Sequence, residues 1–287
     1  MNIGFHVGLL KTFEETLRYH HQKSGGIRSF QLFTKNPRQT QIKKINEEDA
    51  KKCKEYVERE GIFLVTHASY LLNMSNSENW EKKIENGKNE LDLAEKIGAR
   101  GTVFHVGKHL KLSVKEGEDK MFDYIQTMIQ YIQEKNYRVK YVIETSARCG
   151  TELLWKMEDL GAFFRRFSEE ERTHLAICID TCHIFSAGYR IHNEEGCNDY
   201  IQLVGDHIGW ENVMVIHLND SLSLKGCGCK LDRHANIMKG FIQDGMKRLI
   251  EFTTGYGIPH VLETPYEEDK IFETHLGEIE LIRNWFI

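Results

Sequence analysis

The sequence has few prolines, no long apolar run and no stretch of low complexity. Only three of its 287 residues are proline, and each stands beside an expected strand end. No apolar run approaches the roughly 20 residues that a membrane-spanning helix requires, so we expect no membrane partner. The N-terminus also lacks the basic segment and the long apolar segment of a secretion signal. We therefore expect a protein that is intracellular, cytoplasmic or nuclear, and not secreted.

A disulfide framework and an excess of positive charge are absent as well. The chain has seven cysteines, an odd number, and is too long to need the disulfides that hold small secreted proteins together. Cys227 and Cys229 could hold a soft metal, but reduced thiols are favoured because such a zinc site normally has a second ligand pair. The net charge of −5 does not indicate a nucleic-acid partner. It does not exclude one, since bound divalent cations would concentrate positive charge at one place.

Short apolar runs of β-forming residues recur along the chain, and seven of the eight end in His, Glu or Asp. The runs end at His6, Phe33, His67, His105, Glu144, Asp180, His217 and Glu263. Consecutive ends are 27 to 46 residues apart, and a strand, a helix and two loops need about 30 to 40 residues. The repeat predicts a single α/β domain over residues 1–287, a (β/α)8 TIM barrel with a closed parallel sheet.

Helical periodicity separates the expected strands. Asn46 is expected to cap a helix over residues 47–60, which Gly61 ends. Apolar residues three and four apart predict two more helices, over residues 80–97 and around residues 122–132. Further helices are expected around residues 160–167, 241–252 and 279–286.

Imidazole and carboxylate side chains should meet at one mouth of this barrel, because all of its strands end on the same face. That mixture of ligands suits zinc, manganese or iron. Loop residues add to it, with His183 in the loop after Asp180, and with Asp232 and His234 on one side of an extended loop. The candidate metal ligands are His67, His105, Glu144, Asp180, His183, His217, Asp232, His234 and Glu263. They are too many for one ion, and His6 is expected to be a hydrogen-bonding neighbour of the ligands instead.

Nine short motifs carry a resemblance to a known family. They are GFH at 4–6, LFTKNPRQ at 32–39, HASYLLN at 67–73, FHVGKH at 104–109, VIET at 142–145, CIDTCH at 178–183, HLND at 217–220, DRH at 232–234 and LETP at 262–265. With these motifs in order, the chain resembles endonuclease IV nearly end to end. This is the zinc-dependent apurinic/apyrimidinic (AP) endonuclease family 2, whose fold is a TIM barrel.

The resemblance implies three metal ions, all zinc, with manganese as an alternative at one site. It implies that the first ion is held by His67, His105 and Glu144, the second by Glu144, Asp180, His217 and Glu263, and the third by His183, Asp232 and His234. Glu144 would therefore bridge two ions. The implied catalytic residues are Glu144, Asp180 and Glu263, carboxylates that orient the attacking water while they remain ligands.

The implied activity belongs to base excision repair of DNA. It is hydrolysis of the phosphodiester 5′ to an abasic site in duplex DNA, which leaves a 3′-hydroxyl and a 5′-deoxyribose phosphate, with trimming of 3′ ends as a side activity. A duplex that lacks one base loses little stacking when it bends or flips a nucleotide. Arg38, Tyr70 and Leu71 match the family's DNA-inserting positions, and Arg233 is expected to bind a phosphate. We expect the protein to act as a monomer.

Three positions depart from the family pattern. Thr40 stands where an aromatic residue is frequent, and Leu222 stands where a basic residue is usual. Met238 replaces the first glycine of the pattern after DRH. None of the three is a candidate ligand, so they bear on DNA recognition and not on the metal site.

Two other functions stay open on the sequence. A metal-dependent sugar isomerase or epimerase of the xylose-isomerase type shares the barrel and a core of Glu, Asp and His ligands, but it uses fewer metals. His183 and the pair Asp232 and His234 favour the nuclease. The non-enzymatic alternative is a protein that binds abasic DNA without cutting it, and the complete ligand set argues against it.

Overall fold

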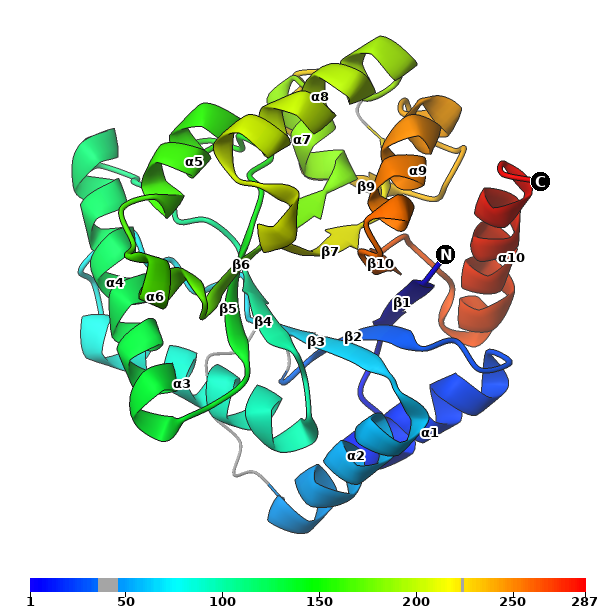
Figure 1. The fold of residues 1–287 in the computed structure, drawn as a ribbon, viewed down its shortest axis with the longest axis horizontal. Coiled ribbons are helices and arrows are strands. Elements are labelled where there is room, and N and C mark those ends of the chain that lie inside the picture. Colours follow the sequence, from blue (N-terminus) through cyan, green and yellow to red (C-terminus); the bar gives the residue numbers. More distant parts are fainter. Residues whose placement is uncertain (36–45, 223–224) are drawn as a thin grey trace.

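Eight parallel strands close into a barrel in the computed structural model, which describes residues 1–35, 46–222 and 225–287. Their bounds are β1 Ile3–Val7, β2 Ser29–Phe33, β3 Phe63–His67, β4 Gly101–Phe104, β5 Lys140–Glu144, β6 Leu175–Asp180, β7 Val213–His217 and β10 His260–Leu262. Around the barrel they follow the order β1, β10, β7, β6, β5, β4, β3 and β2. Helices surround this ring of strands (Figure 1). The predicted (β/α)8 TIM barrel is confirmed.

The helices alternate with the strands along the chain. Their bounds are α1 Phe13–Lys23, α2 Glu47–Glu60, α3 Trp80–Ile97, α4 Val114–Lys135, α5 Met157–Phe164, α6 Glu169–Arg172, α7 Thr181–Ala187, α8 Glu194–His207, α9 Lys247–Gly255 and α10 Ile271–Asn284. Short 3-10 helices η1 (Trp210–Asn212), η2 (Gln243–Met246) and η3 (Glu268–Lys270) join some of them. Two short strands, β8 (Asp220–Ser221) and β9 (His234–Ala235), pair antiparallel outside the barrel. Within the described ranges, no helix has the length and apolar character that a membrane span needs.

The first predicted helices are confirmed at both ends. The side chain of Asn46 accepts hydrogen bonds from the backbone of Glu48 and Asp49, and Gly61 ends α2 with a φ of 64°. Glycine adopts this left-handed backbone conformation at little energetic cost, because it has no Cβ. α3 covers the predicted residues 80–97, and the periodicity around residues 122–132 belongs to the longer α4.

The later helix boundaries were predicted less well. The helix expected over residues 241–252 is divided into η2 and α9, and α9 begins only at Lys247. The last helix begins at Ile271, well before the expected residue 279. α1 and α8 were not predicted, although Asn193 caps α8 through a side-chain hydrogen bond from the backbone of Gly196.

The interior of the barrel is a small apolar layer that lies beneath the strand ends. It consists of Val65, Val103, Val142, Ala176, Cys178, Val215 and Val261. Side chains alternate along a strand, so the residue two positions further on points to the same side. On β5, for example, Val142 fills the interior and Glu144 follows it on the same side, at the mouth. The strand register thus decides which side chains line the mouth.

Candidate metal centre

The strands deliver six of the nine candidate ligands to one mouth of the barrel. Four of them are the last residues of their strands, and the other two directly follow a strand. The strand-ending residues are His67, Glu144, Asp180 and His217, and the following ones are His105 and Glu263. Each stands two residues after an inward-facing member of the apolar layer, so alternation turns it toward the centre. The predicted strand ends are therefore within one residue of the observed ones.

The predicted loop position of His183 is wrong, because this residue lies in the first turn of α7. Asp180 caps that helix, and its Oδ1 accepts a hydrogen bond from the backbone N–H of His183 at 3.0 Å. The helix therefore starts directly after β6, without a loop between them. Asp180 is therefore both the last residue of β6 and the N-cap residue of α7.

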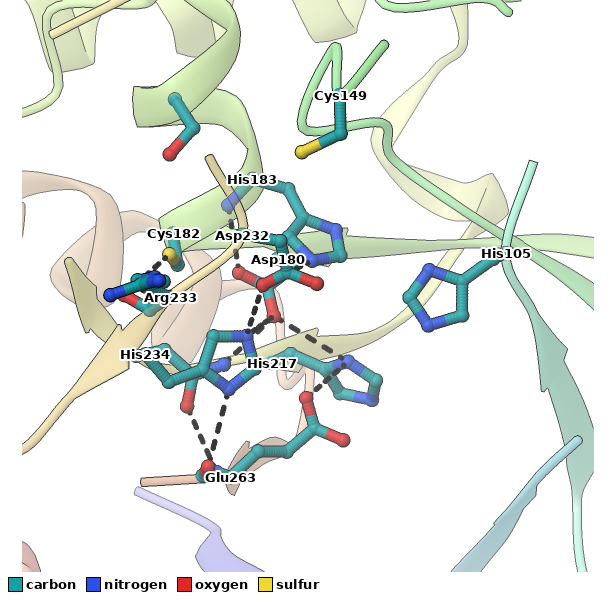
Figure 2. Close-up of polar contacts among 12 residues, drawn as sticks. His105, Cys149, Asp180, Cys182, His183, His217, Asp232, Arg233, His234 and Glu263 are labelled. Atoms are coloured by element: carbon teal, nitrogen blue, oxygen red, sulfur yellow. Dashed lines mark hydrogen bonds and ion pairs between the residues drawn. The ribbon is translucent and has the colours of Figure 1, made fainter. Parts of the chain in front are cut away.

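The remaining two candidates come from the segment before and within β9. Asp232 precedes this strand and His234 begins it. Both side chains point to the same side, because Nε2 of His234 lies 3.2 Å from Oδ1 of Asp232. Figure 2 shows them facing the side chains that come from β6, α7 and β7.

The nine candidates form three groups whose ligand atoms lie within 4.8 Å of one another. The groups are His67, His105 and Glu144; Glu144, Asp180, His217 and Glu263; and His183, Asp232 and His234. These are the same three sets that the family resemblance implied. Two further groups bring in cysteines, one with Cys178 and one with Cys182.

Glu144 belongs to two of the three groups that the nine candidates form, because its two oxygens face different neighbours. Its Oε2 lies 3.3 Å from Nε2 of His67 and 3.4 Å from Nε2 of His105. Its Oε1 lies 2.8 Å from Nδ1 of His217. Oε2 thus faces the first group and Oε1 faces the second, an arrangement suited to a ligand that bridges two cations.

The third group contains two buried ring nitrogens that lie near a carboxylate but lack a hydrogen-bond partner among the described residues. Nε2 of His183 lies 3.3 Å from Oδ1 of Asp232, the same oxygen that Nε2 of His234 approaches. Within the described part of the chain, neither buried nitrogen has a hydrogen-bond partner. Buried polar atoms are normally hydrogen-bonded, so an unpartnered pair aimed at one carboxylate suits a bound cation. Imidazole and carboxylate ligands together fit zinc.

Electrostatics at the mouth favour positive charge. Burial opposes the ionisation of Glu144, but the neighbouring imidazoles of His105 and His217 outweigh it and hold the pKa of this carboxyl well below its usual value. Burial likewise disfavours a charged His234, yet the negative charges of Asp180 and Asp232 raise the pKa of this imidazole to about 9. Metal ions bind in competition with such protons, so these carboxylates can stabilise either kind of positive charge.

The sequence did not single out several residues that hold the ligands in place. Thr145 accepts a hydrogen bond from the backbone of Asp180, and Asn219 donates to Oδ2 of Asp180 at 2.8 Å. Gln31 lies on β2 and hydrogen-bonds to both His217 and Glu263. The sequence did contain a signal for Gln31. It is a polar residue in an otherwise apolar run, and it lies two positions before Phe33, so both side chains point to the same side of the strand.

Two other expectations concern side chains beside the ligands. His6 is in none of the ligand groups of the described residues, and its Nδ1 lies 3.1 Å from Nε2 of Gln31. Cys227 and Cys229 are free thiols, and neither is in a ligand group of the described residues. The sulfur of Cys227 contacts the carbonyl oxygen of Tyr189 at 3.4 Å.

The expected DNA-binding residues lie around the mouth. Tyr70 and Leu71 follow β3 and expose 47% and 53% of their surface, and Tyr70 and Phe33 line the same pocket as the ligands. Arg233 is exposed between Asp232 and His234. Arg38 and Thr40 lie outside the described residues.

Comparisons with known proteins agree with this architecture. A family model described as a xylose isomerase-like TIM barrel matches residues 22–285. The crystal structure of endonuclease IV from Thermus thermophilus superimposes with a TM-score of 0.84 at 24% identity, covering 100% of this chain and 99% of that one. A D-tagatose 3-epimerase-like protein has a TM-score of 0.70 at 15% identity, covering 100% of both chains. At these identities the two structures show a shared fold alone.

Sequence relatives are more specific. A protein of Symbiobacterium thermophilum named "Probable endonuclease 4" is 32% identical over 272 residues, which cover 94% of this chain and 95% of the relative. A protein of the same name from Clostridium botulinum is 32% identical over 99% of this chain and 98% of its own length. With this identity over nearly its whole length, the chain belongs to the endonuclease IV family of xylose isomerase-like TIM barrels.

Proposed function

We propose that this chain is a zinc-dependent endonuclease that hydrolyses the DNA phosphodiester 5′ to an abasic site. The products are a 3′-hydroxyl and a 5′-deoxyribose phosphate, and trimming of blocked 3′ ends is a second activity of the same site. One observation carries the proposal, the sharing of Glu144 between two ligand groups that adjoin a third. The names of the relatives agree with an endonuclease. Residues 1–287 act as one domain and one monomer.

Three zinc ions fit the three groups, with manganese as an alternative in one of them. His67, His105 and Glu144 would hold the first ion, Glu144, Asp180, His217 and Glu263 the second, and His183, Asp232 and His234 the third. When bound, these ions supply an activated water and offset the negative charge on the phosphate and the departing oxygen.

Glu144, Asp180 and Glu263 are the proposed catalytic carboxylates. Their oxygens orient the attacking water in line with the phosphorus, while the same groups remain ligands. Little rearrangement is available to them, because Glu144 and Asp180 are buried and the backbone N–H of Glu263 donates to Oδ1 of Asn219 at 2.9 Å. Asn219 also donates to the carboxylate of Asp180, so one amide side chain contacts both Asp180 and the backbone of Glu263.

Residues around the mouth select the abasic site. Tyr70 and Leu71 enter the space that the missing base leaves, where an aromatic ring can stack on neighbouring bases. Arg38 is proposed to insert beside them, and Arg233 to neutralise a phosphate. The exposure of Tyr70 and Leu71, so close to the ligands, supports this role.

Incision of a synthetic duplex tests the proposal. The duplex carries one tetrahydrofuran residue, an abasic analogue without the aldehyde that β-elimination needs, so that only hydrolysis cuts the strand. We expect zinc-loaded protein to cut 5′ to this residue and to leave a 3′-hydroxyl that a DNA polymerase extends. An uncut strand would contradict the proposal, and binding without cutting would favour the non-enzymatic alternative. Interconversion of sugars by the same preparation would favour the isomerase.

A further inference from the structure

A single buried glutamine contacts two ligands of the second group. Gln31 lies in β2 with no exposed surface, one strand position before Leu32 and two before Phe33. Its Oε1 lies 2.7 Å from Nε2 of His217, and its Nε2 donates to Oε1 of Glu263 at 2.5 Å. Neither ligand lies on a strand next to β2. Around the barrel β2 is followed by β1, then by β10, which precedes Glu263, and then by β7, which ends at His217.

Chemistry fixes the orientation of this amide. An ionised carboxylate only accepts hydrogen bonds, so the NH2 group of Gln31 must face Glu263 and its carbonyl oxygen must face His217. The second N–H of the amide is directed to Nδ1 of His6 at 3.1 Å. Both N–H groups of the amide therefore point away from His217, toward Glu263 and His6. If the amide were flipped, its oxygen would face the carboxylate of Glu263, and two acceptors would repel each other.

The carbonyl oxygen in turn fixes the proton of His217. An oxygen acceptor beside Nε2 requires that Nε2 carries the ring proton. The other nitrogen, Nδ1, lies 2.8 Å from Oε1 of Glu144 and 3.1 Å from Oε2 of Glu263, within the second ligand group. A metal ligand needs a nitrogen with a free lone pair, and a hydrogen bond from the opposite nitrogen selects which one is free.

We propose that Gln31 is a positioning residue that holds the ring proton of His217 on Nε2 and the carboxylate of Glu263 in place, so that both ligands face the second ion. The inference rests on the proposed metal site and adds to it a residue that binds no ion. Loss of such an outer hydrogen bond typically weakens metal binding about 10- to 100-fold. The loss should fall on one ion of the three. Gln31 contacts His217 and Glu263, and among the three proposed ligand sets these two residues occur only in the second.

Zinc retention tests the proposal with a matched control. Gln31→Leu keeps the approximate volume and removes the contacts of the amide with His217, Glu263 and His6. Gln126→Leu makes the same change at a glutamine that bonds to Glu171, away from the mouth. After dialysis against a competing chelator, we expect three zinc ions per chain in the wild type and in Gln126→Leu, but two in Gln31→Leu. Excess zinc should restore incision by Gln31→Leu. Retention of all three ions by Gln31→Leu, or loss of all three together, would overturn the proposal.

A measurement on the wild type covers the case in which Gln31→Leu fails to fold. In zinc-loaded protein with 15N-labelled histidine, nuclear magnetic resonance should find the proton of His217 on Nε2, bonded to a carbonyl oxygen. A proton on Nδ1 would overturn the inference. A wild type that binds no zinc would instead contradict the proposed function, and the inference would fall with it, so the two failures are distinguishable.

Discussion

The buried floor of the mouth and its exposed rim differ in almost every respect. The floor, defined as His67, Glu144, Asp180 and His217, exposes at most 3% of any residue. The rim, defined as Tyr70 and Leu71, exposes 47% and 53% of these two residues. Floor residues end strands whose register is fixed by their neighbours, whereas rim residues stand on loops. The strands of the barrel thus fix the positions of the floor residues, whereas no strand or helix fixes the rim residues.

Removal of zinc should have the largest effect, because it acts on the whole floor. We expect a chelator to abolish incision and to lower the melting temperature by roughly 10 °C, since ligands present at about 1,000 times their Kd add about 4 kcal/mol of stability. Calorimetry and the incision assay measure the two effects on one sample. Restoration by zinc serves as the control, and undiminished incision in the chelator would contradict a metal-dependent floor.

Glu144→Gln should nearly abolish incision while the barrel stays folded. The amide has one acceptor oxygen and no charge, so it cannot serve two groups as the carboxylate does. We expect a loss of more than about 100-fold, beyond that of changes outside the ligand set. Circular dichroism checks the fold, and Glu280→Gln on the exposed side of α10 is the control. Wild-type rates in Glu144→Gln would refute the bridging role.

Tyr70→Ala should affect the rim and spare the floor. Stacking of a base on an aromatic ring contributes about 1–3 kcal/mol, so the preference for abasic over intact duplex should fall about 5- to 150-fold. Zinc content should not change. Tyr256→Ala removes a similarly exposed ring at the end of α9 and should leave the preference intact. Arg38→Ala should act in the same direction as Tyr70→Ala, and equal losses on both duplexes would contradict these roles.

Met238→Gly should have the smallest effect, and it should be stabilising. Met238 has a φ of 69°, a left-handed conformation that costs a residue with a Cβ roughly 1–2 kcal/mol. Part of this gain is offset by the backbone entropy that glycine loses on folding, so we expect a gain of about 0.5–1 kcal/mol in the free energy of unfolding. Denaturant titration measures it. Met238→Ala keeps the Cβ and should gain nothing, and equal gains in both variants would rule out backbone strain as the cause.

The difference between floor and rim also explains which features were predictable. Strand ends such as Glu144 and His217 could be predicted because a closed parallel barrel brings all of them to one face. His183 was misplaced because its helix starts without a loop, through a cap that only the folded chain reveals. Gln31 was missed because its partners lie on other strands and far along the chain. A sequence pattern predicts contacts between residues that are close along the chain. The contacts of Gln31 with His217 and Glu263 form only when the sheet closes into a barrel.

The central claim is that nine ligands at the mouth of the barrel hold three ions that act together. Titration of zinc into metal-free protein tests it, with bound zinc and incision of the tetrahydrofuran duplex followed in the same samples. The account predicts that incision reaches its maximum only as the third zinc ion binds to each chain. Full incision with one ion per chain, or none at any zinc content, would contradict it.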